Sequence, residues 1–158
     1  MRHDNDCIPL VQHLQLEHRR LSEALHQTQA AVAAWIGSQQ NAQEVVRQLM
    51  QFREEPERHY AEEEQGGCLE EAECRCPSLA GEVKRIELEH GTLRSDMDRL
   101  VAQASLLAKS SECVEQLEQA FQEFAARLRK HEAAENRVMA YGFGAEAVDE
   151  FTDEPNHF

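Results

Sequence analysis

The chain has 158 residues, only 4 prolines and 7 glycines, and a formal net charge of -14 at pH 7. This length suits one domain with its own core, and the scarcity of helix breakers favours an all-helical class. The negative charge argues against nucleic acid or an anionic membrane surface as the main partner.

The sequence predicts a cytoplasmic protein that does not span a membrane. The longest apolar run, residues 30–36, is far shorter than a membrane-spanning helix. The first seven residues have no apolar stretch behind their single arginine, so we expect no secretory signal. Five cysteines, unevenly placed, indicate thiols in a reducing compartment rather than a disulfide framework.

The first two amphipathic segments are predicted as helices over about 9–36 and 41–65. Pro9 suits a first helical turn, and Asn41 with Glu44 forms a candidate capping box. Pro56 lies inside the second segment and should bend it one turn before His59. The predicted buried stripes are Val11, Leu14, His18, Leu21, Leu25, Val32 and Trp35, then Val45, Leu49, Phe52, Pro56, His59 and Glu63.

Two further helices are predicted over about 78–109 and 111–142, with Ser78 as an N-cap. Apolar residues spaced alternately by three and four favour nearly aligned helices. We therefore predict an antiparallel up-down four-helix bundle over residues 1–144, followed by an acidic tail over 145–158. The stripes are Leu79, Val83, Ile86, His90, Leu93, Met97, Leu100, Ala104 and Leu107, then Val114, Leu117, Phe121, Phe124, Leu128, His131, Glu135 and Val138.

Six polar residues stand on these stripes at positions that otherwise hold Leu, Ile, Val or Phe. A shift of 72 residues superimposes one half of the set on the other, and each half contains a lone histidine and a His-x-x-x-Glu motif. A helical hairpin repeated in tandem would bring all six side chains to one level of the core. The pairs are His18 with His90, His59 with His131, and Glu63 with Glu135.

The chemistry of these residues predicts a two-metal site. Residues four apart on a helix share a face, imidazole suits Fe, Mn, Cu or Zn, and a carboxylate can bridge two cations. Two buried glutamates without a counter-charge would be costly. The alternative is that each histidine is simply hydrogen-bonded in the core; the joint occurrence of all six at one offset disfavours it.

A ferritin-like di-iron site is a second alternative, because it uses Glu-x-x-His motifs. Glu23-x-x-His26 and Glu87-x-x-His90 match that string. However, Glu23, His26 and Glu87 lie off the stripes, and the two strings do not follow the repeat. We therefore disfavour this class of site.

The pattern resembles the hemerythrin-like (HHE cation-binding) domain over about residues 10–142, including the stretch from Glu63 to Ala72. The resemblance implies a non-haem centre of two Fe ions with an oxo or hydroxo bridge. In that centre Glu63 and Glu135 would be bridges, and the terminal ligands would be His18, His59, His90 and His131.

One departure from the oxygen-carrying hemerythrins narrows the expected function. Those proteins have a His-x-x-x-His motif on the third helix. Here the residues one turn before and one turn after His90 are Ile86 and Arg94. The chain looks more like four-His, two-Glu variants, which the family links to iron sensing, nitric-oxide response or iron-centre repair. We expect a protein that binds or senses O2, NO or peroxide rather than a dedicated enzyme.

Several alternatives stay open. The chain could be a peroxide- or NO-consuming oxidoreductase using Tyr60 or Tyr141, an iron storage or repair protein, or a purely structural bundle. Glu62 and Glu64 flank Glu63, and either could add a ligand. Three cysteines in the predicted connection are one short of a closed zinc site. A redox pair or switch is a second interpretation, and spare thiols without a functional role are the commoner one. They are Cys68, Cys74 and Cys76.

Overall fold

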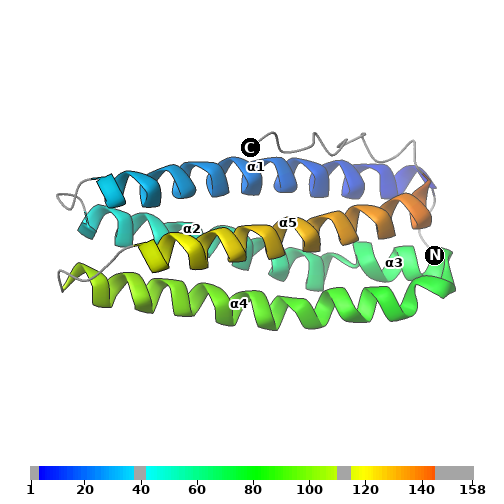
Figure 1. Cartoon of the computed structure of the whole chain (residues 1–158). Helices are drawn as coiled ribbons and strands as arrows, with labels where there is room; N and C mark the ends of the chain where they lie inside the picture. Colours follow the sequence, from blue (N-terminus) through cyan, green and yellow to red (C-terminus); the bar gives the residue numbers. More distant parts are fainter. Residues whose placement is uncertain (1–3, 38–41, 110–114, 145–158) are drawn as a thin grey trace.

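Four long helices form the molecule in this computed structural model, which describes residues 4–37, 42–109 and 115–144. Side chains are described for 11–35, 42–65, 67–109 and 115–144. Helix α1 packs against α2 and α5, and α4 packs against the same two helices (Figure 1). The predicted all-helical antiparallel bundle is confirmed. Its long helices are α1 (Asp4–Gly37), α2 (Ala42–Gly66), α4 (Ala80–Ala108) and α5 (Glu115–Phe143).

The helix bounds differ from the sequence prediction at several ends. Helix α1 begins at Asp4 and includes Pro9, which the sequence had placed in the first helical turn. Pro56 lies within α2, as predicted. The candidate capping residue Asn41, the start of the fourth helix at 111 and the tail over 145–158 lie outside the described residues.

The connection between α2 and α4 contains a helix that the periodicity did not predict. Helix α3 (Cys68–Arg75) follows Gly67, whose φ of 68° is a left-handed conformation suited to glycine. A 3-10 turn, η2 (Pro77–Leu79), then leads into α4. Ser78 therefore lies inside η2 and does not cap α4, contrary to the prediction.

Helix α3 packs closely on the last turn of α5. A Cβ added to Gly142 would lie 2.6 Å from the Cβ of Ala72. Gly142 does not end α5, which continues to Phe143. This glycine therefore permits a close helix–helix approach, where the sequence had indicated a helix stop.

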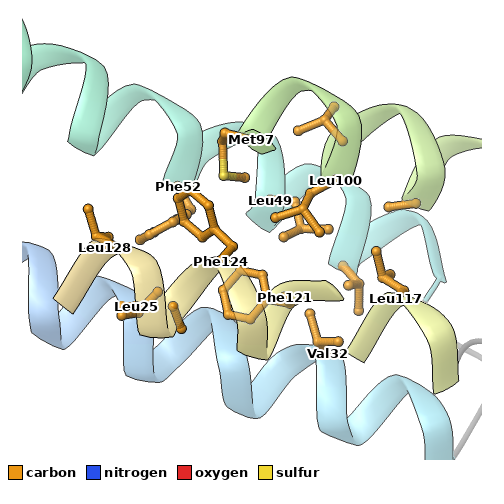
Figure 2. Close-up of a cluster of buried hydrophobic side chains, with 14 of the residues drawn as sticks. Leu25, Val32, Leu49, Phe52, Met97, Leu100, Leu117, Phe121, Phe124 and Leu128 are labelled. Carbon is orange, nitrogen blue, oxygen red and sulfur yellow. The ribbon is translucent and has the colours of Figure 1, made fainter. Parts of the chain in front are cut away.

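The predicted stripes form the core. Every stripe residue with a described side chain is buried except Leu107, which is half-buried. One apolar cluster lies toward the α1–α2 and α4–α5 connections, where Phe52 packs edge-on against Phe121 and Phe124 (Figure 2). A second cluster, which includes Val11, Leu69 and Val138, lies toward α3. The polar stripe residues fall between these two clusters along the helices.

None of the described helices combines the length and apolar character needed to cross a lipid bilayer.

Candidate metal centre

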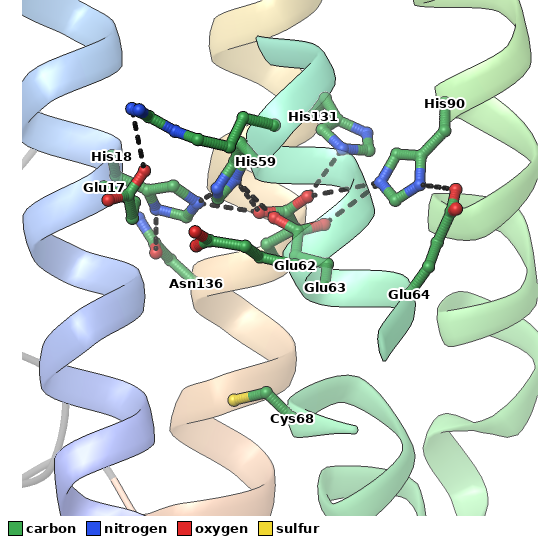
Figure 3. A network of polar contacts seen from close by, with 12 residues as sticks. Glu17, His18, His59, Glu62, Glu63, Glu64, Cys68, His90, His131 and Asn136 are labelled. Carbon is green, nitrogen blue, oxygen red and sulfur yellow. Dashed lines mark hydrogen bonds and ion pairs between the residues drawn. The ribbon is translucent and has the colours of Figure 1, made fainter. Parts of the chain in front are cut away.

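The six polar stripe residues meet at one level of the bundle. Their donor atoms form two overlapping clusters, and within each cluster all donors lie within 4.8 Å of one another. His18 and His59 form one cluster with the two glutamates, and His90 and His131 form the other with the same glutamates (Figure 3). The shared carboxylates belong to Glu63 and Glu135.

Glu135 on α5 lies between the two histidine pairs. Its Oε2 is 2.7 Å from His18 Nε2 and 3.4 Å from His59 Nε2. Its Oε1 is 2.6 Å from His131 Nε2 and 3.8 Å from His90 Nε2. Each oxygen thus faces one pair, which is the arrangement that a bridging carboxylate requires.

Glu63 on α2 repeats this arrangement. Its Oε1 contacts His59 Nε2, one turn earlier on the same helix, and its Oε2 lies 3.0 Å from His90 Nε2 on α4. The two carboxylates are therefore placed so that each could span two ions. Each ion would have two imidazole nitrogens and one oxygen from each glutamate.

Several of these buried atoms have no hydrogen-bond partner among the described residues. The atoms without a partner are both carboxylate oxygens of Glu63, the Oε1 of Glu135 and the Nε2 atoms of His90 and His131. The close N···O approaches among them do not have the direction of an N–H···O bond. Unpartnered donor atoms in a core are costly, and metal ions between them would remove that cost. The residues present therefore fit a dinuclear metal site.

Three of the histidine rings are oriented by hydrogen bonds from their far nitrogens. His131 Nδ1 donates to Glu89 Oε2 at 2.7 Å, and His90 Nδ1 donates to Glu64 Oε1 at 3.1 Å. His18 Nδ1 donates to Asn136 Oδ1 at 3.1 Å. When these rings are neutral, such bonds leave each Nε2 with a lone pair that faces the centre, as metal-bound histidines require.

A known protein family matches most of the chain. The family described as the hemerythrin HHE cation binding domain matches residues 10–141. The chain belongs to this family. Comparisons with curated proteins and with solved structures gave no match. The resemblance inferred from sequence is thus confirmed, and the HHE domain here carries a buried His/Glu metal site.

The outer hydrogen bonds of this HHE domain follow the internal repeat. Glu64 and Asn136 are 72 residues apart, each directly follows one of the two shared glutamates, and each hydrogen-bonds a histidine of the other hairpin. Glu64 therefore orients His90 and is not placed among the central donors. Sequence reasoning did not find Asn136, although the same repeat could have indicated it.

The carboxylates raise the proton affinity of the histidines around them. Burial lowers the pKa of His59 and His90, but Glu135 and Glu63 outweigh it and raise both pKa values to about 10. The pKa values of His18 and His131 are also raised, because Glu135 outweighs burial. In the metal-free protein these rings hold protons that metal ions must displace.

The pKa values of Glu135, in the centre, and of its neighbour Glu132 are shifted in opposite directions. Burial raises the pKa of Glu135, but the neighbouring His131, His18 and His59 outweigh it and hold this pKa well below its usual value. Burial raises the pKa of Glu132 to about 7. Glu135 is thus kept ionised, as a bridging ligand must be.

The two tyrosines considered from the sequence differ in position. The Tyr60 ring stacks on that of His90 at a centroid distance of 4.6 Å, and its buried hydroxyl has no hydrogen-bond partner among the described residues. Burial raises the pKa of Tyr60 above the ordinary value of a tyrosine, so the phenol is neutral. Tyr141 is 70 % exposed on α5. Only Tyr60 is seen to contact a histidine of the centre.

The ferritin-like alternative does not fit the structure. Glu23, His26 and Glu87 are all exposed and cannot meet in the core. His13, the other off-stripe histidine with a described side chain, is exposed as well and hydrogen-bonds with Glu62 at 2.9 Å. Glu62 is therefore directed away from the central donors and is not one of them.

The three cysteines between α2 and α4 have different environments. Cys68 is buried and its Sγ donates to Met139 Sδ at 3.2 Å, whereas Cys74 is exposed and Cys76 is half-buried. All three are thiols in the structure. Cys7 and Cys113 lie outside the part of the chain with described side chains.

Proposed function

We propose that this HHE domain holds two iron ions and binds a small ligand, O2, NO or peroxide, at the centre. The observation that carries the proposal is the pair of overlapping clusters that share Glu63 and Glu135. Such a donor set supplies about four protein donors to each ion. Iron ions of this kind commonly take five or six ligands, so positions remain for solvent and an external ligand.

A pocket supports access by a small ligand. A cavity of about 310 Å³ is lined by His59 and Glu63 from the centre and by Leu14 and Cys68 at its sides. It reaches the centre from the α1–α2 face, on the side of the His18–His59 pair. An external ligand would therefore approach the ion held by that pair.

The donor set also supports iron over zinc. Four imidazoles and two bridging carboxylates offer no thiolate, and closed zinc sites are usually four-coordinate and rich in cysteine. Imidazole with carboxylate is the mixture found at non-haem iron. Iron at such a centre would supply reversible changes of redox state and an open position for the ligand.

Metal analysis followed by spectroscopy tests this proposal. We expect about two iron ions per chain after anaerobic loading with Fe²⁺. Addition of NO, O2 or peroxide should then give a new absorption band with a stoichiometry of one ligand per centre. A chain that takes up no iron, or a loaded centre whose spectrum does not respond to any of the three, would contradict it.

Tyr60 supports a second candidate, an oxidoreductase that consumes peroxide or NO. Its hydroxyl is buried without a partner, and its ring stacks on His90, so a redox-active side chain contacts the centre. Repeated turnover with an external reductant would favour this candidate. A stable adduct that forms once would favour the binding protein.

A further inference from the structure

Three residues outside the centre form a second group of potential ligands. His13 and Glu17 lie one turn apart on α1, and Glu62 faces them from α2. Each offers a donor atom, and these atoms lie within 4.8 Å of one another. An imidazole with two carboxylates is a donor set that suits a divalent transition-metal ion. We call these three residues the rim cluster.

The rim cluster and the centre share one pocket. The cavity of about 310 Å³ is lined by all three rim residues and by His59 and Glu63. Side-chain exposure falls from 58 % and 42 % at His13 and Glu62 to 12 % at Glu17. It then falls to 2 % and 3 % at His59 and Glu63. The donors thus form a series that runs from solvent to the buried centre.

Glu63, at the inner end of this series, has a buried carboxylate of the kind that binds a cation. Glu63 is buried, lines the pocket, and neither of its carboxylate oxygens has a hydrogen-bond partner among the described residues. Figure 3 shows Glu62 beside Glu63 on α2, with the Glu62 carboxylate directed toward α1. An ion that leaves the rim would therefore next meet Glu63, the carboxylate that both clusters of the centre share.

Only one residue of the rim cluster follows the repeat that builds the centre. Glu17 corresponds to Glu89, whereas the residues 72 positions after His13 and Glu62 are Arg85 and Ala134. Arg85 pairs with Glu82 at 3.5 Å, and Ala134 is buried in the apolar core. The repeat therefore accounts for the donors of the centre and for Glu17, but not for His13 and Glu62, which occur on one side only.

From these observations we propose that the rim cluster is a third cation site, which receives divalent metal ions and passes them through the pocket to the buried pair. An ion entering a site this deeply buried must lose its water shell, and carboxylates along the path offset that loss. Arg58 and Arg20 lie 3.8 and 4.0 Å from Glu17. Such long, partly exposed ion pairs are weak and leave Glu17 available.

This inference rests on the proposed dinuclear centre and can be tested separately from it. We would titrate the metal-free full-length chain with Co²⁺ by calorimetry and follow loading by stopped-flow absorbance. The wild-type chain should bind two ions tightly and a third more weakly. The H13A/E62Q variant should lose the weak ion, keep the two tight ones, and load them about tenfold more slowly.

The matched control is H26A/E23Q, which makes the same two changes at exposed positions elsewhere on α1 and should behave like wild type. In an H59A/E135A background a single weak ion should remain and should be lost on adding H13A/E62Q. If H13A/E62Q keeps wild-type stoichiometry and loading rate, the rim site is wrong while the dinuclear centre stands. If wild type binds only one ion and H13A/E62Q removes it, the rim site stands and the dinuclear function is wrong.

Discussion

Glu135 Oε2 lies 2.7 Å from His18 Nε2, although the two residues are 117 positions apart in the chain. The contact joins the first and last long helices of the bundle at the level of the centre. The other oxygen of Glu135 faces His131, one turn earlier on its own helix. A single carboxylate thus connects the two halves of the internal repeat.

Replacing Glu135 should therefore disrupt both metal positions. In Glu135→Ala we expect the metal content to fall from about two ions per chain to below one, since each ion loses a shared ligand. The metal-free variant should also lose about 3–5 kcal/mol of unfolding free energy, because protonated histidines lose a buried counter-charge. Metal analysis and urea unfolding measure the two effects.

The control for this variant is Glu123→Ala, which removes an exposed carboxylate from the same helix. Its metal content and unfolding free energy should match those of wild type. Two retained ions in Glu135→Ala would show that this carboxylate does not bridge the centre.

The hydrogen bond from His131 to Glu89 should tune metal affinity without supplying a ligand. Glu89→Ala removes the acceptor that orients the His131 ring. We expect a loss of metal affinity of about 10–100-fold with unchanged stoichiometry, as is usual for such outer partners. Competition with a chelator of known affinity measures it. Glu87→Ala, an exposed glutamate two residues earlier, should leave the affinity unchanged.

The raised histidine pKa values predict opposite pH dependences for stability and for metal binding. His59 and His90 have pKa values of about 10 in the folded, metal-free protein and about 6.5 when unfolded. Their stabilising contribution is thus fully present below about pH 6.5 and is lost as the pH rises toward 10. Metal affinity should increase over the same interval, because the ions displace these protons.

Urea unfolding of the metal-free chain between pH 6.5 and 9.5 measures the first effect, and proton release during Co²⁺ binding measures the second. The decline in stability should be shallower in His59→Gln, which lacks one of these groups. A metal-free protein whose stability rises across this interval, or metal binding without proton release, would contradict the prediction.

Gly142 should tolerate no side chain, even though alanine is ordinarily the better helix former. Its Cβ would lie 2.6 and 2.7 Å from the Cβ and Cα of Ala72, and backbone cannot move aside easily. We expect Gly142→Ala to lower the unfolding free energy by about 1–3 kcal/mol in urea titrations of metal-free protein. Gly91→Ala, in α4 with nothing within 4 Å of the added carbon, should instead raise it by about 0.5–1 kcal/mol.

The residues that helical periodicity placed correctly are those whose burial depends only on their own helix. Leu25, Leu49 and Leu128 are buried because an apolar stripe of period 3.6 must face the other helices. The sequence did not predict helix α3, because its eight residues are too few to show a helical repeat of apolar positions. Its position depends on contact with α5, through Ala72 and Gly142, which no local pattern reveals.

The sequence by itself determined the bundle and the six polar residues at one level, because both follow from the spacing of residues along the chain. The family entered as a resemblance of these motifs, which the family comparison confirmed. Only the tertiary structure decided how consecutive residues divide their roles. Glu62 faces His13 at the rim, Glu63 faces the centre, and Glu64 orients His90. Successive side chains on a helix point about 100° apart. What each one meets is therefore set by the neighbouring helices, and those come together only when the chain folds.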